Sequence, residues 1–431
     1  SQTKMSTSQN FQGAIGAWID SELHPKGATA PSSPNSNFIS MKLNQVYKSL
    51  DYLCIAWFGV DMKNPEQPTI NTSNPGLQMI VSDARAQNTN IRLFATLAWT
   101  DEIYNDLKTI IDNPTTLQAF ANNIASYLDE NNMDGLDIDW EYPISNLTPT
   151  ECAGWLNALR QAFGSDHFIS ISPATTMGLD AKAVNANCDI INLQTYSGFT
   201  RASDFVNIGI TPSLLGFGAK FETQGSAPFQ NALQAYKEYI AGFTANGQHY
   251  PYNTICNWRL DSDDWAFEQG QQLLLRQYIK GSPYTVPFDD NTIIKAQSTP
   301  TLMQNVIVRS GEVVDSIQTS NASKDGQYVV EMLQHGGDGG MQNPTMALSN
   351  GLSEFSYVTG NWYGNQVVAQ ITINGTSYPH SVSPSVSNTQ SRTIQAASGK
   401  SIVAFSGNTQ YVLLAGGGFT WVLSSIDAVF G

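Results

Sequence analysis

The stretch Met133-Asp134-Gly135-Leu136-Asp137-Ile138-Asp139-Trp140-Glu141-Tyr142-Pro143 carries carboxylates on alternate residues, at Asp137, Asp139 and Glu141. Successive side chains of a β-strand point to opposite faces, so these three acids share one face and Ile138 and Trp140 share the other. Three acids on one face of a short buried strand repel one another and lose hydration, which disfavours a purely structural role. The stretch therefore predicts a functional site.

The composition indicates a globular protein of two or three domains. Its 431 residues are 41% hydrophobic and 13% charged, which is enough apolar material for a large core. The net charge of −15 argues against nucleic acid or an anionic membrane surface as the main partner. No apolar run reaches the length of a transmembrane helix. Because each cysteine sits in an apolar segment without a close partner, we expect buried free thiols at Cys54, Cys152, Cys188 and Cys256.

The start of the chain is polar and lacks the apolar core of a signal peptide. We expect residues 1–12 to form a polar leader. The chain is either a mature, processed form or one exported by another route, and a secreted, extracellular location is our expectation.

Apolar runs alternate with helical patterns through residues 13–282. Two helices have clear signals: Pro114–Glu130 has 3.6-residue apolar spacing, and Thr148–Phe163 begins with the capping-box pair Thr148 and Glu151. Eight βα units in roughly 280 residues predict a (β/α)8 TIM barrel, and hence an α/β fold class. A doubly wound open sheet is the alternative, but the glycine fingerprint after its first strand is absent. The expected strands are 14–19, 52–58, 91–99, 135–141, 168–171, 189–196, 214–218 and 254–260.

The sequence changes character near residue 282. Short apolar runs separated by glycine- and serine-rich turns replace the helical periodicity, which predicts an all-β domain over residues 301–431. Residues 283–300 contain three prolines and two adjacent aspartates, and we expect them to form a linker.

Active groups of a TIM barrel gather at the carboxyl ends of its strands, so Glu141 should be the most accessible acid, with Asp139 and Asp137 deeper. Burial and neighbouring carboxylates should raise the pKa of at least one of them. A calcium loop is the competing interpretation, but Tyr142 and Thr148 replace the glycine and the carboxylate that it needs. We expect no metal and no cofactor, and an acid suited to protonating a glycosidic oxygen.

The segment Asp134–Glu141 resembles the DGxDxDxE signature of glycoside hydrolase family 18, which comprises chitinases and endo-β-N-acetylglucosaminidases. The resemblance implies a retaining, substrate-assisted mechanism with Glu141 as general acid and then as base. Asp139 would orient and stabilise the N-acetyl group of the substrate. Asp137 would sit beneath Asp139 and share a proton with it.

Further site residues follow from the same resemblance. Leu193-Gln194-Thr195-Tyr196 is similar to the family's sixth-strand motif, so Tyr196 would bond the acetamido carbonyl and Gln194 would line the pocket. Trp258 would form the floor beneath the −1 sugar. Tyr142 is a further candidate for substrate binding.

The chain also departs from the family pattern. Ser197 stands where Asp or Asn is usual, and Thr96-Leu97-Ala98-Trp99 replaces the SxGG motif. We expect Trp18, Trp57 and Trp99 to belong to the core or to a groove wall rather than to the specific site.

The C-terminal domain has its own resemblance. Ile307–Ile317, Gly336–Gly340 and Ser401–Gly407 look like pieces of a jacalin-related β-prism lectin. The family's sugar-binding GxxxD loop would correspond to Gly407–Tyr411, with Tyr411 at the aspartate position. Sugar binding by this domain is therefore a hypothesis.

Three functions remain open at this point. Hydrolysis of β-1,4 bonds in chitin or chitooligosaccharides comes first, and cleavage of N-glycan cores by an endo-β-N-acetylglucosaminidase comes second. The third is an inactive, chitinase-like carbohydrate-binding protein or toxin subunit. The expected partner is a glycan that contains N-acetylglucosamine, with a second glycan or a protein bound through the C-terminal domain.

Overall fold

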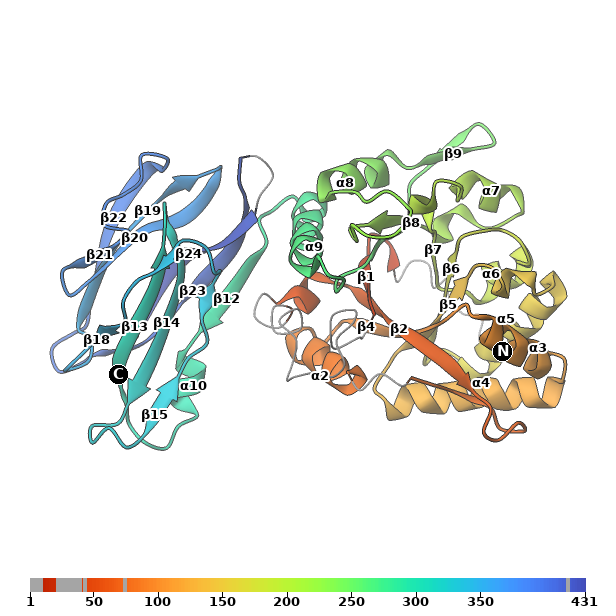
Figure 1. The fold of residues 1–431 in the computed structure, drawn as a ribbon, viewed down its shortest axis with the longest axis horizontal. Helices are drawn as coiled ribbons and strands as arrows, with labels where there is room; N and C mark the ends of the chain where they lie inside the picture. The colour runs from red at the N-terminus through yellow and green to blue at the C-terminus, as the bar shows by residue number, and fades with distance from the viewer. Residues whose placement is uncertain (1–10, 21–40, 42–44, 73–75, 416–418) are drawn as a thin grey trace. The chain divides into compact units, whose positions relative to one another are not determined.

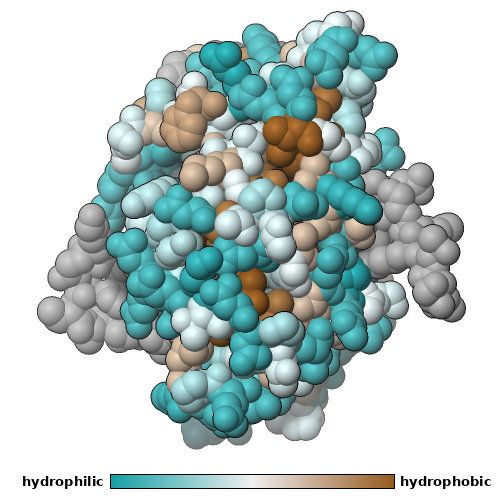
Figure 2. Space-filling view, turned by 90° about the vertical axis from the view of Figure 1, so that its right-hand side faces the viewer, coloured by the Kyte–Doolittle hydropathy of each residue, from teal (hydrophilic) through white to brown (hydrophobic). Residues whose placement is uncertain are grey.

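The computed structural model describes residues 11–20, 41, 45–72, 76–415 and 419–431. The chain divides into two compact units between Lys280 and Gly281, and each is described by itself (Figure 1). No helix among the described residues is long and apolar enough to cross a membrane. The surface drawn in Figure 2 is largely hydrophilic, with hydrophobic side chains in small separate groups. All four cysteines are buried free thiols, as predicted.

The predicted TIM barrel is confirmed. Its eight parallel strands close into a ring because β1 pairs with both β2 and β11. A short antiparallel strand, β3 (Thr69–Asn71), extends β2 outside the ring. The barrel strands are β1 (Ile15–Ile19), β2 (Tyr52–Asp61), β4 (Arg92–Leu97), β5 (Gly135–Trp140), β6 (Phe168–Pro173), β7 (Ile190–Asn192), β8 (Leu215–Lys220) and β11 (Ile255–Trp258).

Helices follow the strands around the barrel (Figure 1). Between α8 and β11 the chain adds a hairpin of β9 (Phe243–Ala245) and β10 (Gln248–Tyr250) that the sequence analysis missed. The α-helices of this unit are α2 (Leu77–Gln87), α3 (Asp101–Ile111), α4 (Pro114–Glu130), α5 (Pro149–Phe163), α6 (Ala181–Asn187), α7 (Ala202–Asn207), α8 (Ala232–Ala241) and α9 (Trp265–Lys280). The 3-10 turns are η2 (Val46–Ser49), η3 (Ile144–Asn146), η4 (Thr195–Ser197) and η5 (Pro212–Leu214).

The acidic stretch forms β5, which lies between β4 and β6 in the barrel. Ile138 and Trp140 are both 1% exposed, and the indole N–H of Trp140 donates to the carbonyl of Met177 at 2.8 Å. In the register, Asp137 lies beside Thr96 of β4 and Ser170 of β6, and Asp139 lies beside Ser172. The strand therefore places small hydroxyl side chains on both sides of Asp137 and on one side of Asp139.

The second unit is mostly β-strand, which agrees with the predicted β domain apart from one short helix, and its described residues form three antiparallel sheets. One core joins them, with Val308 and Ile317 from one sheet, Phe355 and Ile371 from the next, and Phe405 from the third. The first sheet holds β13 (Leu302–Ser310), β14 (Val314–Ala322), β15 (Val329–Glu331), β16 (His335–Gly336), β17 (Met341–Gln342) and β18 (Met346–Ala347). The second holds β19 (Glu354–Trp362), β20 (Asn365–Ile373), β21 (Thr376–Tyr378) and β22 (Ser387–Gln395), and the third holds β12 (Thr285–Asp289), β23 (Ile402–Leu413) and β24 (Phe419–Phe430).

Two expectations for this unit are wrong. Residues 283–300 are not a free linker, because β12 pairs with β23 over five residues and α10 (Asn291–Lys295) follows it. Gly407–Tyr411 is not a loop either, because it lies inside β23 and pairs with β24. Tyr411 is 7% exposed and packs against Trp421 with ring centroids 5.2 Å apart. A strand interior cannot offer the open backbone of a binding loop, so Tyr411 is a packing residue.

Candidate active site

Asp137 is a fully buried carboxylate surrounded by four hydrogen-bond donors. The Thr96 hydroxyl, at 2.8 Å, and the Trp18 indole N–H, at 3.4 Å, donate to one of its oxygens. The hydroxyls of Ser170, at 2.8 Å, and Ser172, at 2.7 Å, donate to the other. Burial raises the pKa of Asp137, and the four donors oppose that rise. Asp137 thus holds side chains of β1, β4 and β6 together beneath the site.

Asp139 and Glu141 form a carboxyl pair at the end of β5. Burial, then the charge of Glu141 and a hydrogen bond with Glu141, raise the pKa of Asp139 well above its ordinary value. The raised pKa favours a protonated carboxyl group at Asp139. The donor to Asp139 is the Gln194 amide, while Asp137 accepts from its own four donors, so proton sharing between Asp137 and Asp139 stays a prediction.

Gln194 holds Asp139 from the neighbouring strands. Its amide nitrogen donates to Oδ1 of Asp139 at 3.1 Å and to the carbonyl of Ser172 at 3.0 Å. Both amide protons are therefore in use, which leaves the side-chain oxygen of Gln194 as its acceptor for a ligand. The predicted place of Gln194 in the pocket agrees with the structure.

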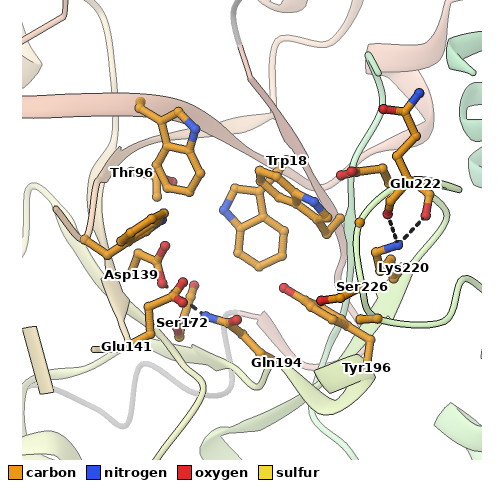
Figure 3. Close-up of a pocket in the computed structure, with 16 residues that line it drawn as sticks. Trp18, Thr96, Asp139, Glu141, Ser172, Gln194, Tyr196, Lys220, Glu222 and Ser226 are labelled. Carbon is orange, nitrogen blue, oxygen red and sulfur yellow. Dashed lines mark hydrogen bonds between the residues drawn. The ribbon is translucent and has the colours of Figure 1, made fainter. Parts of the chain in front are cut away.

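Tyr196 stands across the pocket from the carboxyl pair, and its hydroxyl points into the pocket (Figure 3). Burial, and then the carboxylates of Asp139 and Glu141, raise the pKa of Tyr196 well above its ordinary value. The phenol therefore stays protonated and can donate a hydrogen bond. Ser197, by contrast, bonds the Thr200 hydroxyl at 2.8 Å inside its own turn.

These residues line one pocket of about 270 Å³ at the carboxyl ends of the barrel strands (Figure 3). Trp258 contacts two more tryptophans there, with centroid distances of 6.1 Å to Trp18 and 5.7 Å to Trp57. Two predicted site residues do not line the pocket: Asp137 is fully buried, and Tyr142 is 72% exposed. The lining residues are Trp18, Trp57, Thr96, Trp99, Asp139, Glu141, Ser172, Gln194, Tyr196, Lys220, Glu222, Gln224, Gly225, Ser226, Ala227 and Trp258.

The sequence analysis missed one side of this pocket. Lys220 and Glu222 follow from the end of β8, and no motif in the sequence marked them. Trp18, Trp57 and Trp99 were assigned to core or groove wall, and all three line the pocket. The available signal was positional: each tryptophan lies near the carboxyl end of a predicted barrel strand, where barrel sites form.

The site combines two adjacent carboxyl groups, a protonated phenol, an amide and several indole rings. Such groups can donate and accept protons beside a neutral, ring-shaped ligand that stacks on an indole. Within the described ranges, no group of three His, Cys, Asp or Glu side chains could hold a metal ion.

Comparisons with known proteins bear on this arrangement. Family models match the chain twice, as glycosyl hydrolases family 18 over residues 28–273 and as a jacalin-like lectin domain over residues 279–417. Probable chitinase 10 of Drosophila melanogaster is 25% identical over 104 residues, which are 23% of this chain and 4% of that protein. The chain thus spans only a small part of the length of that relative.

Similar solved structures include the GH18 chitinase ChiB of Flavobacterium johnsoniae, with 16% identity, 63% of this chain and 94% of that chain covered, and a TM-score of 0.44. A class V chitinase of Nicotiana tobaccum in complex with NAG4 has 13% identity, coverages of 62% and 99%, and a TM-score of 0.44. A chitinase-like agglutinin of Robinia pseudoacacia has 14% identity, coverages of 60% and 99%, and a TM-score of 0.45. Because the family 18 model matches more than half of the residues of this chain, the chain belongs to glycosyl hydrolases family 18.

Proposed function

We propose that the barrel hydrolyses β-1,4 glycosidic bonds next to N-acetylglucosamine, in chitin or chitooligosaccharides, by a retaining, substrate-assisted mechanism. The observation that carries this proposal is the placement of the Asp139 and Glu141 carboxyl groups next to each other on one side of the pocket (Figure 3). Two-carboxylate glycosidases hold their acids about 5–5.5 Å apart when retaining and about 6.5–9.5 Å apart when inverting. Acids next to each other leave no room for a sugar carbon or a water between them. Glu222, the third carboxylate among the described residues that line the pocket, pairs with Arg259, so we infer that the nucleophile comes from the substrate.

In this proposal the residues have the roles that the resemblance to family 18 implies. Glu141, at the open end of the strand, protonates the leaving oxygen while the acetamido oxygen of the substrate attacks the anomeric carbon. Asp139 turns its hydrogen bond toward the acetamido N–H and stabilises the positive charge of the cyclic intermediate. Tyr196 donates to the acetamido oxygen, and Trp258 stacks on the sugar ring. Glu141 then takes a proton from the water that opens the intermediate.

The size of the pocket supports recognition of a single sugar unit. The cavity of about 270 Å³ lies just below the usual range for ligand pockets, which favours a small group such as one sugar unit. The remaining sugars of a longer substrate would lie over the pocket rim, where Trp99 is 43% exposed.

The decisive variant is Glu141→Gln, which keeps the shape of the side chain and removes its acidity. We expect turnover of β-1,4-linked N-acetylglucosamine oligomers to fall by about 10²–10⁴-fold or more, with binding retained. Asp166→Asn is the matched control, because Asp166 is an exposed acid in the turn before β6. Unchanged hydrolysis by Glu141→Gln would refute the mechanism.

A second candidate is endo-β-N-acetylglucosaminidase activity on N-glycan cores, favoured by the jacalin-like domain on the same chain. Incubation with chitooligosaccharides and, separately, with an N-glycosylated protein, followed by mass spectrometry of the products, distinguishes the two substrates. Absence of products from both would favour the non-enzymatic, carbohydrate-binding alternative. Sugar binding by the second unit and secretion of the protein stay predictions.

A further inference from the structure

The side of the pocket that faces Asp139 and Glu141 is formed by a segment without regular secondary structure. Residues 221–231, here called the β8 loop, connect β8 to α8. Five of its residues line the pocket: Glu222, Gln224, Gly225, Ser226 and Ala227. Figure 3 shows Lys220, Glu222 and Ser226 across the cavity from Asp139 and Glu141. The conformation of the β8 loop therefore sets the width of the pocket.

Lys220 supports this loop from inside the barrel. It is the last residue of β8, is 4% exposed, and is the single cation among the described residues that line the pocket. Its ammonium group donates to the backbone carbonyls of Glu222 and Gln224, both at 2.6 Å. Gly225, with φ of +87°, turns the chain back over the lysine, and a Cβ there would lie 4.0 Å from Cε of Lys220.

A buried ammonium group is costly unless its protons are satisfied. Burial lowers the pKa of Lys220, while the Glu222 carboxylate opposes this shift. Two of its three N–H donors are accounted for by the loop carbonyls, so one donor remains for a hydroxyl group in the pocket. The lysine thus orders the backbone of the loop and can also contribute to recognition of the ligand.

The outer side of the β8 loop is tied to the segment after β11. Gln224 donates to Asp263 at 3.0 Å, and the Thr223 hydroxyl bonds Asp264. The Glu222 carboxylate pairs with Nε of Arg259 at 3.1 Å. Because Arg259 directly follows the pocket floor residue Trp258, the loop and the floor are connected through one ion pair.

We propose that Lys220 is a positioning residue that fixes the β8 loop as a substrate-recognition surface opposite Glu141, where the loop contacts the neutral hydroxyl groups of the bound sugar. This inference rests on the proposed function for the identity of the sugar. Removing the ammonium group leaves two loop carbonyls without their donor and loosens the surface that contacts the ligand. The same change leaves Asp139, Glu141 and Gln194 in place. Substrate affinity should therefore fall more than the rate of the chemical step.

The test compares Lys220→Met with Lys237→Met, an exposed lysine on α8, using the tetramer of β-1,4-linked N-acetylglucosamine. We expect KM for Lys220→Met to rise about tenfold or more, with kcat within about threefold of the parent, and no change for Lys237→Met. The dissociation constant measured by calorimetry in the Glu141→Gln background should rise by the same factor. An unchanged KM, or a loss confined to kcat, would overturn the inference.

A second measurement needs no substrate. Acrylamide quenching of tryptophan fluorescence should increase in Lys220→Met, because loosening of the β8 loop exposes the tryptophans of the pocket. Asp263→Ala removes the acceptor of the hydrogen bond from Gln224 and leaves Lys220 unchanged. Acrylamide quenching and KM should both increase in this variant, as in Lys220→Met. If Lys220→Met does not fold, Lys220→Gln decides the question, because its shorter neutral side chain also removes the ammonium group, and parent-like KM and quenching in it would contradict the inference. A parent protein that cleaves and binds no N-acetylglucosamine oligomer refutes the proposed function, whereas the quenching result still tests the role of Lys220.

Discussion

Replacing Asp137 by alanine tests whether a buried carboxylate under the pocket organises the site from below. The substitution removes the acceptor of four donors that come from β1, β4 and β6. Ser170 and Ser172 lose the acceptor of their hydroxyl protons but keep one partner, since Nδ2 of Asn192 donates to both oxygens, at 3.2 Å and 3.4 Å. Thr96 and Trp18 lose the carboxylate that orients them. The local damage therefore falls on two residues that line the pocket.

The expected cost can be estimated from these contacts. Each buried polar group left unsatisfied costs about 1–3 kcal/mol, so two of them cost roughly 2–6 kcal/mol. Removal of a buried charge offsets part of this cost, and we expect a net loss of about 3 kcal/mol of unfolding free energy. Asp137→Asn should cost about 1–2 kcal/mol, because its amide nitrogen can face the serine hydroxyls, which are able to accept.

Urea denaturation followed by circular dichroism measures these losses, with the exposed Asp166→Asn as control. The indole of Trp18 should also become more mobile, which fluorescence anisotropy can detect. A loss below about 1 kcal/mol for Asp137→Ala, with unchanged anisotropy, would show that the four hydrogen bonds contribute little and refute this reasoning.

Three further outcomes follow from the structure. Burial raises the pKa of Glu268 from 4.5 to about 7; the folded protein therefore binds a proton that the unfolded chain releases, and stability should fall as pH rises from about 5 to 7. Urea denaturation at several pH values in this range should show that the unfolding free energy of Glu268→Gln changes less with pH than that of the parent protein. An equal pH dependence would contradict the assignment. Thr148→Ala removes the capping box of α5 and should lower the unfolding free energy by about 1 kcal/mol, measured against the exposed Thr115→Ala; a loss equal to that of the control would contradict it. Trp99→Ala should weaken binding of long oligosaccharides in calorimetry more than binding of a disaccharide, with Tm unchanged, and equal weakening of both would exclude a rim contact.

Local signals carried much of the fold. The capping box of Thr148 and Glu151 forms as predicted, and α4 has the predicted bounds, with Asn113 as its N-cap. These features depend on residues three or four apart in the chain, which the sequence displays directly. The hairpin of β9 and β10 escaped prediction because its strands are three residues long and only partly buried, so they show little periodicity.

The errors in the second unit share one physical cause. Residues 283–300 look like a linker because their composition is turn-rich, yet β12 finds a partner more than a hundred residues away in β23. Tyr411 looks like part of a loop because Gly407–Tyr411 corresponds to the GxxxD loop of the lectin family. The pairing of β23 with β24 nevertheless continues through Gly407. Strand pairing between distant segments is decided by which edges meet, and the local sequence does not record that.

The sequence by itself determined the barrel and its acidic strand: eight apolar strands in order, and a strand whose period of two puts Asp137, Asp139 and Glu141 on one face. Only the tertiary structure decided which donors hold these acids. Asp137 accepts from side chains of β1, β4 and β6, and Asp139 accepts from Gln194. Likewise, Trp18, Trp57, Trp99 and Lys220 meet at one pocket because a closed barrel gathers the carboxyl ends of all its strands. Hydrogen bonds and burial depend on distances across the ring, and those distances exist only once the ring has closed.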